Sequence, residues 1–319
     1  MDRVVAPTVA QMEDARRVVA AHLAPTPTAT IVARGRPVYV KLESLQPTGS
    51  FKIRGALAAI SASGADAVIT SSAGNHGLGI AHAASLLNVR ATVVVPANAS
   101  AAKVAQLQRY DIELIQVGSS YDEAQAHAQE LAAQRSVLYV SPFNNTHVIA
   151  GQSTIMTEML AQAPDIEHLV VSVGGGGLIS GALLARDEAR RTDIRVTGVQ
   201  PENSAALYHV LHGGTMDSVV HGPTIADGLA GGGDEESVTN TIVAEHGIKL
   251  VLVPEIDIRR AVREVAETCG LVLEGSATAA YAAIVHNLID DPGGRVGFIA
   301  SGRNIAHELF VEILNEPLS

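Results

Sequence analysis

Short apolar runs rich in valine and isoleucine recur along the chain, and longer stretches with a helical spacing of apolar residues separate them. The runs predict nine strands, at residues 38–42, 67–70, 91–95, 112–117, 137–140, 169–173, 194–199, 249–253 and 296–300. Between them, residues 121–135 and 258–268 are typical of amphipathic helices. Strands that alternate with helices indicate an α/β fold with mostly parallel sheets. Nine strands are many for one compact sheet, so the pattern favours two open, twisted sheets with flanking helices.

The composition fits buried parallel strands. Hydrophobic residues make up 47% of the 319 residues, yet the chain has no tryptophan and only four phenylalanines. Alanine, valine, leucine and isoleucine must therefore build the core, as in parallel sheets that helices cover on both faces. A chain of this length can bury a large core, and we expect two domains.

The charge and the cysteine content exclude several classes of protein. A formal net charge of −11, without a long basic run, argues against nucleic acid or an anionic membrane as the main partner. The single cysteine, Cys269, excludes an internal disulfide framework and fits a reducing cytoplasm. Residues 1–11 lack the features of a signal peptide, and no run of 18 apolar residues is present. We expect a cytoplasmic protein that does not enter a membrane.

Four consecutive glycines, Gly174, Gly175, Gly176 and Gly177, stand between the strand at 169–173 and a helix expected at 178–186. Residues without side chains let backbone N–H groups approach an anion, and a helix N-terminus favours negative charge. The segment matches neither the dinucleotide motif G-x-G-x-x-G nor a Walker-type loop. A small phosphorylated cofactor is therefore favoured over a nucleotide, whereas a simple tight turn would need only one or two glycines.

Three further segments carry polar groups after strands. Lys52 follows the strand at 38–42 and would form a Schiff base if a pocket lowered its pKa, although a lone lysine is usually a surface charge. Residues 71–77, Ser-Ser-Ala-Gly-Asn-His-Gly, offer a hydroxyl, an amide and an imidazole at a helix start, either for a carboxylate or as a helix cap. Ser301 follows the strand at 296–300, where α/β sheets place ligand groups, but in isolation it would be another helix cap.

Together these four segments resemble the fold-type II pyridoxal-phosphate (PLP) enzymes, in particular the threonine/serine dehydratase and serine racemase family. The resemblance covers nearly the whole chain and also includes residues 41–43, 149–152 and 224–229. It implies two open sheets like those of the tryptophan synthase β chain. The cofactor would lie between a large domain, 1–67 with 147–319, and a small domain, 68–146, that closes on the substrate. The family's expected assembly is a homodimer.

The resemblance implies a role for each matching residue. Lys52 would carry PLP as a Schiff base and Phe51 would pack against its ring. The phosphate would lie on Gly174, Gly175, Gly176 and Gly177, the 3′ oxygen on Asn75 and the pyridine nitrogen on Ser301. The loop for the substrate carboxylate would consist of Ser72, Ala73, Gly74, Asn75 and His76.

The implied reaction is α,β-elimination of water from a β-hydroxy amino acid such as threonine or serine. The cofactor acidifies the Cα–H and Lys52 takes that proton, while the family mechanism assigns protonation of the departing hydroxyl to the cofactor phosphate. A neutral hydroxyl such as Ser301 beside the pyridine nitrogen favours prompt loss of the β-group over transamination. The products are a 2-oxo acid and ammonia.

Two departures from the family pattern narrow the reaction. Serine racemases carry a second hydroxyl where this chain has Ala73, which cannot deliver a proton from the other face of the cofactor, so racemisation is disfavoured. Metal-activated members have Glu and Asp where this chain has Gln200 and Ala206. The hard oxygen ligands for Mg²⁺ or Ca²⁺ are missing, and we expect no metal site.

Other departures leave the substrate open. Arg303 replaces a glycine near the expected edge of the pyridine ring, and Asn144 and Asn145 replace an acidic pair. A hydroxyaspartate, a phenylserine or an intermediate of compatible-solute breakdown is therefore an alternative substrate. The chain ends soon after Ser301, which favours a catabolic enzyme without a regulatory domain.

Three alternatives to a dehydratase stay open. A β-replacement enzyme such as a cysteine synthase typically has Thr where His76 stands. A serine racemase is the second alternative, which Ala73 disfavours. The third is a silent PLP or amino-acid binding protein, against which the joint presence of Lys52, the four glycines and Ser301 argues.

Overall fold

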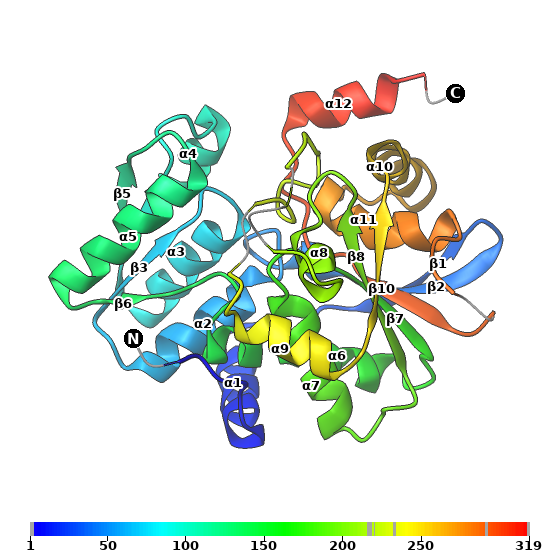
Figure 1. Cartoon of the computed structure of the whole chain (residues 1–319), viewed down its shortest axis with the longest axis horizontal. Helices are drawn as coiled ribbons and strands as arrows, with labels where there is room; N and C mark the ends of the chain where they lie inside the picture. The colour runs from blue at the N-terminus through cyan, green and yellow to red at the C-terminus, as the bar shows by residue number, and fades with distance from the viewer. Residues whose placement is uncertain (1–2, 216–218, 220, 232–233, 291–292, 318–319) are drawn as a thin grey trace.

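Two sheets organise the computed structural model, which describes residues 3–215, 219, 221–231, 234–290 and 293–317 (Figure 1). The larger sheet has the order β1 (Thr28–Ala33), β2 (Arg36–Lys41), β10 (Val296–Ile299), β7 (His168–Ser172), β8 (Arg195–Pro201) and β9 (Lys249–Val253). The smaller has the order β5 (Glu113–Gln116), β4 (Arg90–Val95), β3 (Ala67–Ser71) and β6 (Leu138–Tyr139). Neighbouring strands in the described residues run parallel except for the antiparallel pair β1 and β2. The predicted α/β fold with two mostly parallel sheets is confirmed.

Helices fill the connections between these strands. Those described are α1 (Val9–His22), the 3-10 turn η1 (Glu43–Leu45), α2 (Lys52–Ser63), α3 (Asn75–Leu87), α4 (Ala101–Leu107), α5 (Tyr121–Arg135), α6 (Thr146–Gln162), α7 (Gly177–Glu188), α8 (Ala206–Leu211), α9 (Val238–Glu245), α10 (Glu255–Cys269), α11 (Gly275–Val285) and α12 (His307–Asn315). None of these described helices is both long and apolar enough to cross a lipid bilayer.

All nine predicted strands are present, each with both ends within two residues of its predicted position. The strand that the pattern missed is β1. Its residues alternate between partly buried and exposed, and Val32 is 68% exposed, so the segment lacks the continuous apolar run of a buried strand. It pairs with β2 through a tight turn in which Arg34 and Gly35 both have positive φ.

The larger sheet is covered on both faces, as its apolar strands require. Successive residues of a strand point to opposite faces. Val170 packs into the cluster that includes Tyr281 of α11, whereas Leu169 and Val171 pack into the cluster that includes Ile179 of α7. In Figure 1, α10 and α11 lie on one side of this sheet, and α6 and α7 on the other.

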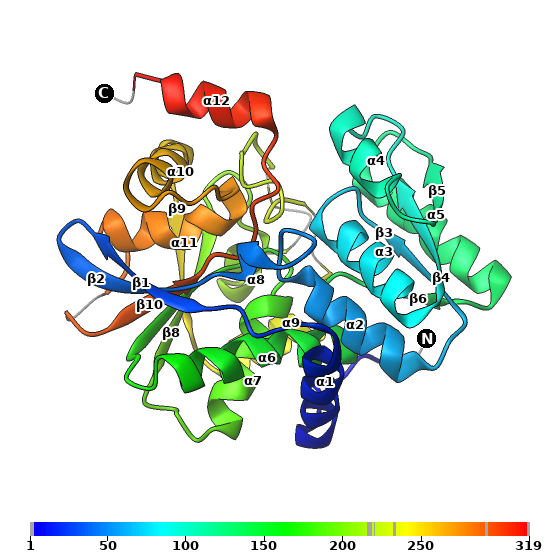
Figure 2. The same ribbon diagram turned by 180° about the vertical axis from the view of Figure 1, so that it is seen from behind.

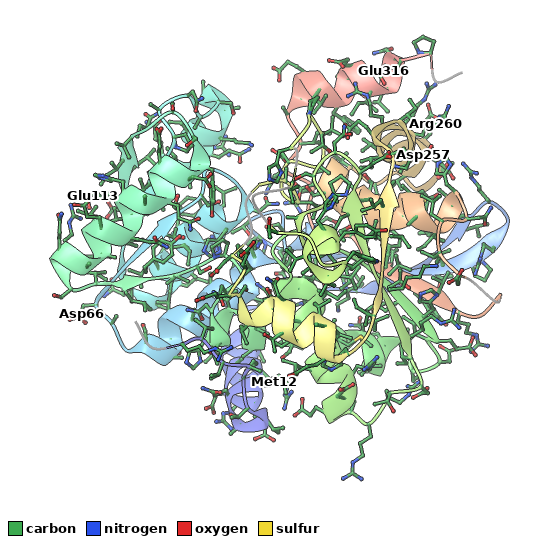
Figure 3. The ribbon with its side chains drawn as sticks, in the orientation of Figure 1. Met12, Asp66, Glu113, Asp257, Arg260 and Glu316 are labelled. Carbon is green, nitrogen blue, oxygen red and sulfur yellow. The ribbon has the colours of Figure 1, made fainter. Side chains whose placement is uncertain are left out.

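The smaller sheet repeats this arrangement beside the larger one (Figure 2). Ile69 and Val94 pack against alanines of α5, among them Ala128, whereas Val68 packs with Ile80 of α3 on the other face. Helix α1 packs beneath the junction, where Met12 contacts alanines of α2 and α6 (Figure 3). The loops that follow β3, β7 and β10 therefore meet between the two sheets.

Candidate active site

A cavity of about 540 Å³ lies where these loops meet, and residues of all four predicted segments line it. Carboxyl ends of parallel strands are the usual ligand sites of α/β sheets. The lining residues predicted from the sequence are Phe51, Lys52, Ser72, Ala73, Gly74, Asn75, His76, Gly174, Gly175, Gly176, Gly177 and Ser301. Segments that are far apart in the sequence thus share one site.

Lys52 begins α2 and projects its amine into this cavity. Its Nζ donates to the backbone oxygen of Pro142 at 3.0 Å and lies 5.2 Å from the centre of the Phe51 ring. Burial lowers the pKa of Lys52 to about 8, although the Glu274 carboxylate acts in the opposite direction. A substantial part of this amine is therefore neutral near pH 8, as a nucleophile or base requires.

A buried ion network fixes the helix that starts with Lys52. Arg54 is fully buried, pairs with Glu43 at 2.8 Å and also reaches Glu158 of α6 at 2.6 Å. Lys41, at the end of β2, joins Glu158 at 2.7 Å. Removing one partner of such a network would leave an uncompensated buried charge, so the network holds β2, η1, α2 and α6 together.

The four glycines lead from β7 into α7, as predicted, and the surroundings of Gly175 and Gly176 leave no room for a side chain. A Cβ on Gly175 would lie 2.3 Å from the Phe143 ring, and one on Gly176 would lie 2.9 Å from Thr239. Gly176 also has φ of +83°, a conformation that residues with a side chain rarely adopt. Because the first N–H groups of a helix have no partner inside it, the start of α7 offers donors to an anion.

The loop 72–76 connects β3 to α3. The Ser72 hydroxyl accepts from the N–H of Gly74 at 3.2 Å, which shapes the turn. His76 is buried, and its Nε2 lies 3.1 Å from the backbone oxygen of Val140. Since a carbonyl oxygen only accepts, Nε2 carries the proton, and Nδ1 has no hydrogen-bond partner among the described residues.

His76 is a neutral group in this site. Burial, and secondly the positive charge of Lys52, lower its pKa to about 3. A neutral ring that uses its only N–H on Val140 has no positive charge or donor for a carboxylate. The imidazole, which the sequence predicted as one of three polar groups for a carboxylate, therefore offers no donor here. The donors that remain are the backbone N–H groups at the start of α3 and the side chains of Ser72 and Asn75.

Ser301 is buried at the end of β10, and its backbone oxygen accepts from Phe51 N at 3.0 Å.

Arg303 points away from the cavity: it is exposed, does not line the site, and its guanidinium donates to the backbone oxygen of Ser44. Asn145 caps α6, and Asn144 does not line the cavity: it donates to Asp234, which does, and accepts from the N–H of Val238. None of these three departures therefore enters the cavity in this structure.

Several polar residues of the lining were not predicted from the sequence, among them Glu274 and Asn304. Glu274 precedes α11 and is only 5% exposed; burial, and secondly the charge of Asp227, raise its pKa to about 7. Asn75 donates to Glu274 at 2.7 Å, and Asn304 donates to Asn75 at 2.6 Å. A lone carboxylate before a helix usually caps that helix, so no distinct signal in the sequence marks it as part of the site.

Gln200 and Ala206 stand where the resemblance puts the acidic ligands of metal-activated members, and neither residue carries a carboxylate. The Gln200 amide donates to Val173 O at 3.2 Å and accepts from Tyr208 N at 2.7 Å, while Ala206 has no ligand atom at all. Among the described residues, no three histidine, cysteine, aspartate or glutamate side chains are grouped to bind a metal ion.

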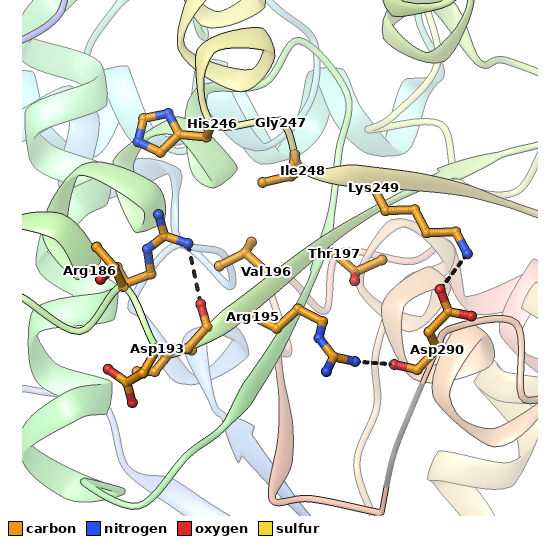
Figure 4. Close-up of a pocket in the computed structure, with 12 residues that line it drawn as sticks. Arg186, Asp193, Arg195, Val196, Thr197, His246, Gly247, Ile248, Lys249 and Asp290 are labelled. Carbon is orange, nitrogen blue, oxygen red and sulfur yellow. Dashed lines mark hydrogen bonds and ion pairs between the residues drawn. The ribbon is translucent and has the colours of Figure 1, made fainter.

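A second hollow of about 610 Å³ lies at the opposite, amino ends of β8 and β9 (Figure 4). Its cations already have partners: Arg195 donates to the backbone oxygen of Asp290 at 2.5 Å, and Lys249 pairs with the Asp290 carboxylate at 2.7 Å. Arg186 donates to Ile194 O at 3.3 Å. The charged side chains of this hollow are therefore bonded to other protein groups and do not point together at a ligand. The residues that we consider for catalysis all line the other cavity.

The first cavity offers what PLP requires. Lys52 supplies an amine with a lowered pKa, the glycine segment supplies a cradle at a helix start, and Asn75 and Ser301 supply polar groups between them. Phe51 adds an aromatic wall. This donor set fits an aldehyde cofactor with a phosphate and a polar ring.

Comparisons with known proteins agree. The family model described as "Pyridoxal-phosphate dependent enzyme" matches residues 19–302. An L-threonine ammonia-lyase of Thermotoga maritima is 37% identical over 290 residues, which cover 89% of this chain and 71% of that protein. A serine racemase of Dictyostelium discoideum is 30% identical over 99% of this chain and 100% of its own.

A solved structure extends the likeness to three dimensions. Maize serine racemase superposes with a TM-score of 0.86 at 26% identity, and 96% of each chain is covered. The chain therefore belongs to the pyridoxal-phosphate dependent enzymes of fold type II, in the family of threonine/serine dehydratases and serine racemases.

Proposed function

We propose that this enzyme is a lyase that removes the elements of water from a small β-hydroxy amino acid, threonine or serine, and yields a 2-oxo acid and ammonia. The water lost in elimination is taken up again when the product hydrolyses, so the sum is one amino acid to one 2-oxo acid and one ammonium ion. The observation that carries the proposal is the meeting of Lys52 with the glycine cradle, Asn75 and Ser301 in one cavity.

PLP, when bound, makes the Cα–H of an amino acid acidic enough for a protein base to remove. Lys52 would hold it covalently, the backbone of 174–177 would hold its phosphate, and Asn75 and Ser301 would hold its ring oxygen and nitrogen. Lys52 is also the residue that we assign as base, because its amine is the titratable nitrogen in the cavity whose pKa lies near neutral pH.

Ala73 favours elimination over racemisation. It lines the cavity in the loop that would bind the substrate carboxylate, and its methyl group carries no proton that it could donate. Racemisation needs an acid on the face opposite the base, whereas elimination proceeds with Lys52 on one face. Relatives named for each of the two activities exist, so the balance between the two is the feature to measure.

Plain threonine or serine is favoured over larger substrates. Arg303, Asn144 and Asn145, which made an unusual substrate attractive, do not line the cavity. Apart from Lys52, the cationic residue of the lining is Lys103, and it is paired with Asp227 at 2.7 Å. No unpaired cation of the described lining therefore awaits a second carboxylate such as that of hydroxyaspartate.

We further propose a cytoplasmic homodimer with a large domain of residues 1–67 and 147–319 and a small domain of residues 68–146. The support is the single cysteine, the acidic net charge and the assembly expected for the family. The strands of the smaller sheet all come from residues 67–139.

The experiment is a product assay on the purified protein with PLP. We expect 2-oxo acid and ammonia in equal amounts from L-threonine and L-serine, with D-serine formed at less than about one tenth of the rate of pyruvate, a difference of at least about 1.4 kcal/mol in activation free energy. D-Serine formation at a comparable rate would overturn the argument from Ala73. Release of 2-oxo acid only from hydroxyaspartate or phenylserine would overturn the substrate assignment.

A further inference from the structure

Asn75 lies in a chain of hydrogen bonds that runs across the junction between the two sheets. The chain starts at the backbone oxygen of Thr48, which accepts from Asn304 Nδ2 at 2.9 Å. The same Nδ2 donates to Asn75 Oδ1 at 2.6 Å, and Asn75 Nδ2 donates to Glu274 Oε1 at 2.7 Å. Asn75 starts α3 on the smaller sheet, whereas the other three residues belong to loops around the larger sheet.

The direction of this chain is fixed at the Thr48 end, and at the Glu274 end whenever Glu274 is ionised. A backbone oxygen only accepts, so the Asn304 amide must turn its NH₂ group toward Thr48, and Asn75 receives its hydrogen bond on Oδ1. An ionised carboxylate also only accepts, so Glu274 requires the NH₂ group of Asn75. An asparagine amide can otherwise rotate by half a turn and exchange its donor and acceptor ends.

Close packing leaves Glu274 and Asn304 little freedom. A Cβ on Gly302 would lie 2.2 Å from Glu274 Oε1, and a Cβ on Gly49 would lie 2.5 Å from Asn304 Oδ1. The N–H of Glu274 donates to the backbone oxygen of Gly302 at 3.2 Å. The glycines of the lysine segment and the serine segment thus make room for the two side chains that clamp Asn75.

We propose that Glu274 is a positioning residue that holds the Asn75 amide with its NH₂ group available to the cofactor. One hydrogen of that group bonds Glu274, and the second remains for an acceptor in the cavity, such as the ring oxygen of PLP. If the Asn75 amide were reversed, its oxygen would face the Glu274 carboxylate and the ring oxygen of the cofactor. Two acceptor oxygens cannot form a hydrogen bond with each other. This inference rests on the proposed function, because it concerns the same site.

The test is a double-mutant cycle that measures the PLP dissociation constant of the full chain. The readout is the absorbance at about 410–420 nm, the range of a protonated PLP Schiff base. It is run at pH 8.5, where the Glu274 carboxylate is ionised. Glu274→Ala is expected to raise the dissociation constant about tenfold and Asn75→Ala by a similar factor. If Glu274 acts through Asn75, then Glu274→Ala changes it less than about twofold in the Asn75→Ala background.

Two further variants sharpen the result. Glu274→Gln keeps an acceptor for Asn75 and is expected to stay within about threefold of the unmodified protein. Glu264→Gln removes a carboxylate that accepts from Tyr281 at 2.9 Å outside the cavity, and it is expected to leave the constant unchanged. Should Glu274→Ala fail to fold, Asn304→Ala gives the same cycle from the other side of Asn75.

Equal losses for Glu274→Ala in both backgrounds, or no loss in either, would overturn the positioning role. Failure of the unmodified protein to develop the absorbance band would instead contradict the proposed function. The two failures are therefore distinguishable in one set of titrations.

Discussion

Lys52 shows how burial converts an ordinary side chain into a reactive one. A lysine amine in water has a pKa of about 10.4, so it is almost fully charged at neutral pH. Desolvation in the cavity disfavours the ammonium form and lowers the pKa to about 8. The Glu274 carboxylate limits this effect because it favours the charged amine.

The rate at which added PLP binds covalently should follow this titration. Only the neutral amine attacks the aldehyde, so the rate of appearance of the absorbance band should rise as the pH increases through about 8 and level off above it. Glu274→Gln removes the charge that favours the ammonium and should move the midpoint to lower pH. Rapid-mixing measurements between about pH 6 and about pH 10 provide the check, and a rate that still climbs steeply at the upper end would contradict it.

At the residue scale the sequence predicted the groups that stand in motifs and missed those that gain their meaning from distant partners. Lys52, Asn75 and Ser301 reach one cavity as expected. Glu274 acquires its role from Asn75, which is 199 residues away in the chain, and no local pattern reports such a contact. For Arg303 the resemblance gave only a position near the edge of the pyridine ring, and the structure turns its guanidinium outward to the backbone oxygen of Ser44.

Among the elements, the passage from β7 through the glycines into α7 tolerates side chains poorly. Gly176 combines a positive φ with a close approach to Thr239, whose hydroxyl donates to Gly175 O at 2.8 Å. Gly64 also has a positive φ, +59°, but nothing lies within 4 Å of the position that a Cβ would occupy there. Both positions therefore have an unfavourable φ for a residue with a side chain, but only Gly176 also has a steric clash. A comparison of the two distinguishes these effects.

Gly64→Ala should lower the free energy of unfolding by about 1 kcal/mol, because alanine disfavours a positive φ, and Gly176→Ala should lower it by more, because its Cβ also clashes with Thr239. Gly176→Ala alone should raise the PLP dissociation constant, by about tenfold, since Thr239 and the loop must shift. Denaturant unfolding and absorbance titration measure the two effects. Equal cofactor affinity in both variants would argue against the glycine segment as the phosphate cradle.

Element types and positions follow well from the sequence where strands are buried on both faces. β7 and β9 are continuous apolar runs, and their predicted limits match within one residue. The strand β1 was not predicted, because an antiparallel edge strand with an exposed Val32 has no such run. Its pairing depends on β2 and on the turn at Arg34 and Gly35, which a search for buried runs does not register.

At the scale of the whole molecule, the two sheets enclose the cavity and an ion pair spans its mouth. Lys103 of α4 and Asp227 of the segment 224–229 are 2.7 Å apart, with side chains 42% and 57% exposed. Leu229 of the same segment packs against the glycine loop, where a Cβ on Gly174 would lie 3.1 Å from Leu229 Cα. The pair therefore joins the small-sheet side to the segment that packs against the glycine loop.

An exposed pair of this kind contributes between about 0 and 1 kcal/mol. Lys103→Ala or Asp227→Ala should therefore raise KM for the amino acid by up to about fivefold at low salt, and the difference should shrink in about 0.5 M salt. The exchanged variant, Lys103→Asp with Asp227→Lys, should recover most of the loss. Steady-state kinetics at the two salt concentrations measure these KM values. If KM of the exchanged variant is as high as KM of the single variants, the ion pair does not contribute to substrate binding.

The division into two sheets was predictable from the number of strands, whereas the meeting of the loops followed from the resemblance to the family and not from the hydrophobic pattern. Periodicity places Ser72, Gly174 and Ser301 after their strands, and only the order β1–β2–β10–β7–β8–β9 beside β5–β4–β3–β6 brings the loops together. The first and last parts of the chain share the larger sheet, since β2 pairs with β10. That pairing places the lysine segment beside Ser301.

The central claim is that Lys52 carries the cofactor and the chemistry, and the most direct measurement compares the purified protein with Lys52→Ala in the presence of PLP. We expect the unmodified protein to show the absorbance band near about 410–420 nm and to release 2-oxo acid from L-threonine or L-serine. Lys52→Ala should lose the band and at least about a thousandfold of the turnover, because it lacks both the covalent link and the base. A Lys52→Ala protein that retains both the band and the turnover would contradict the account.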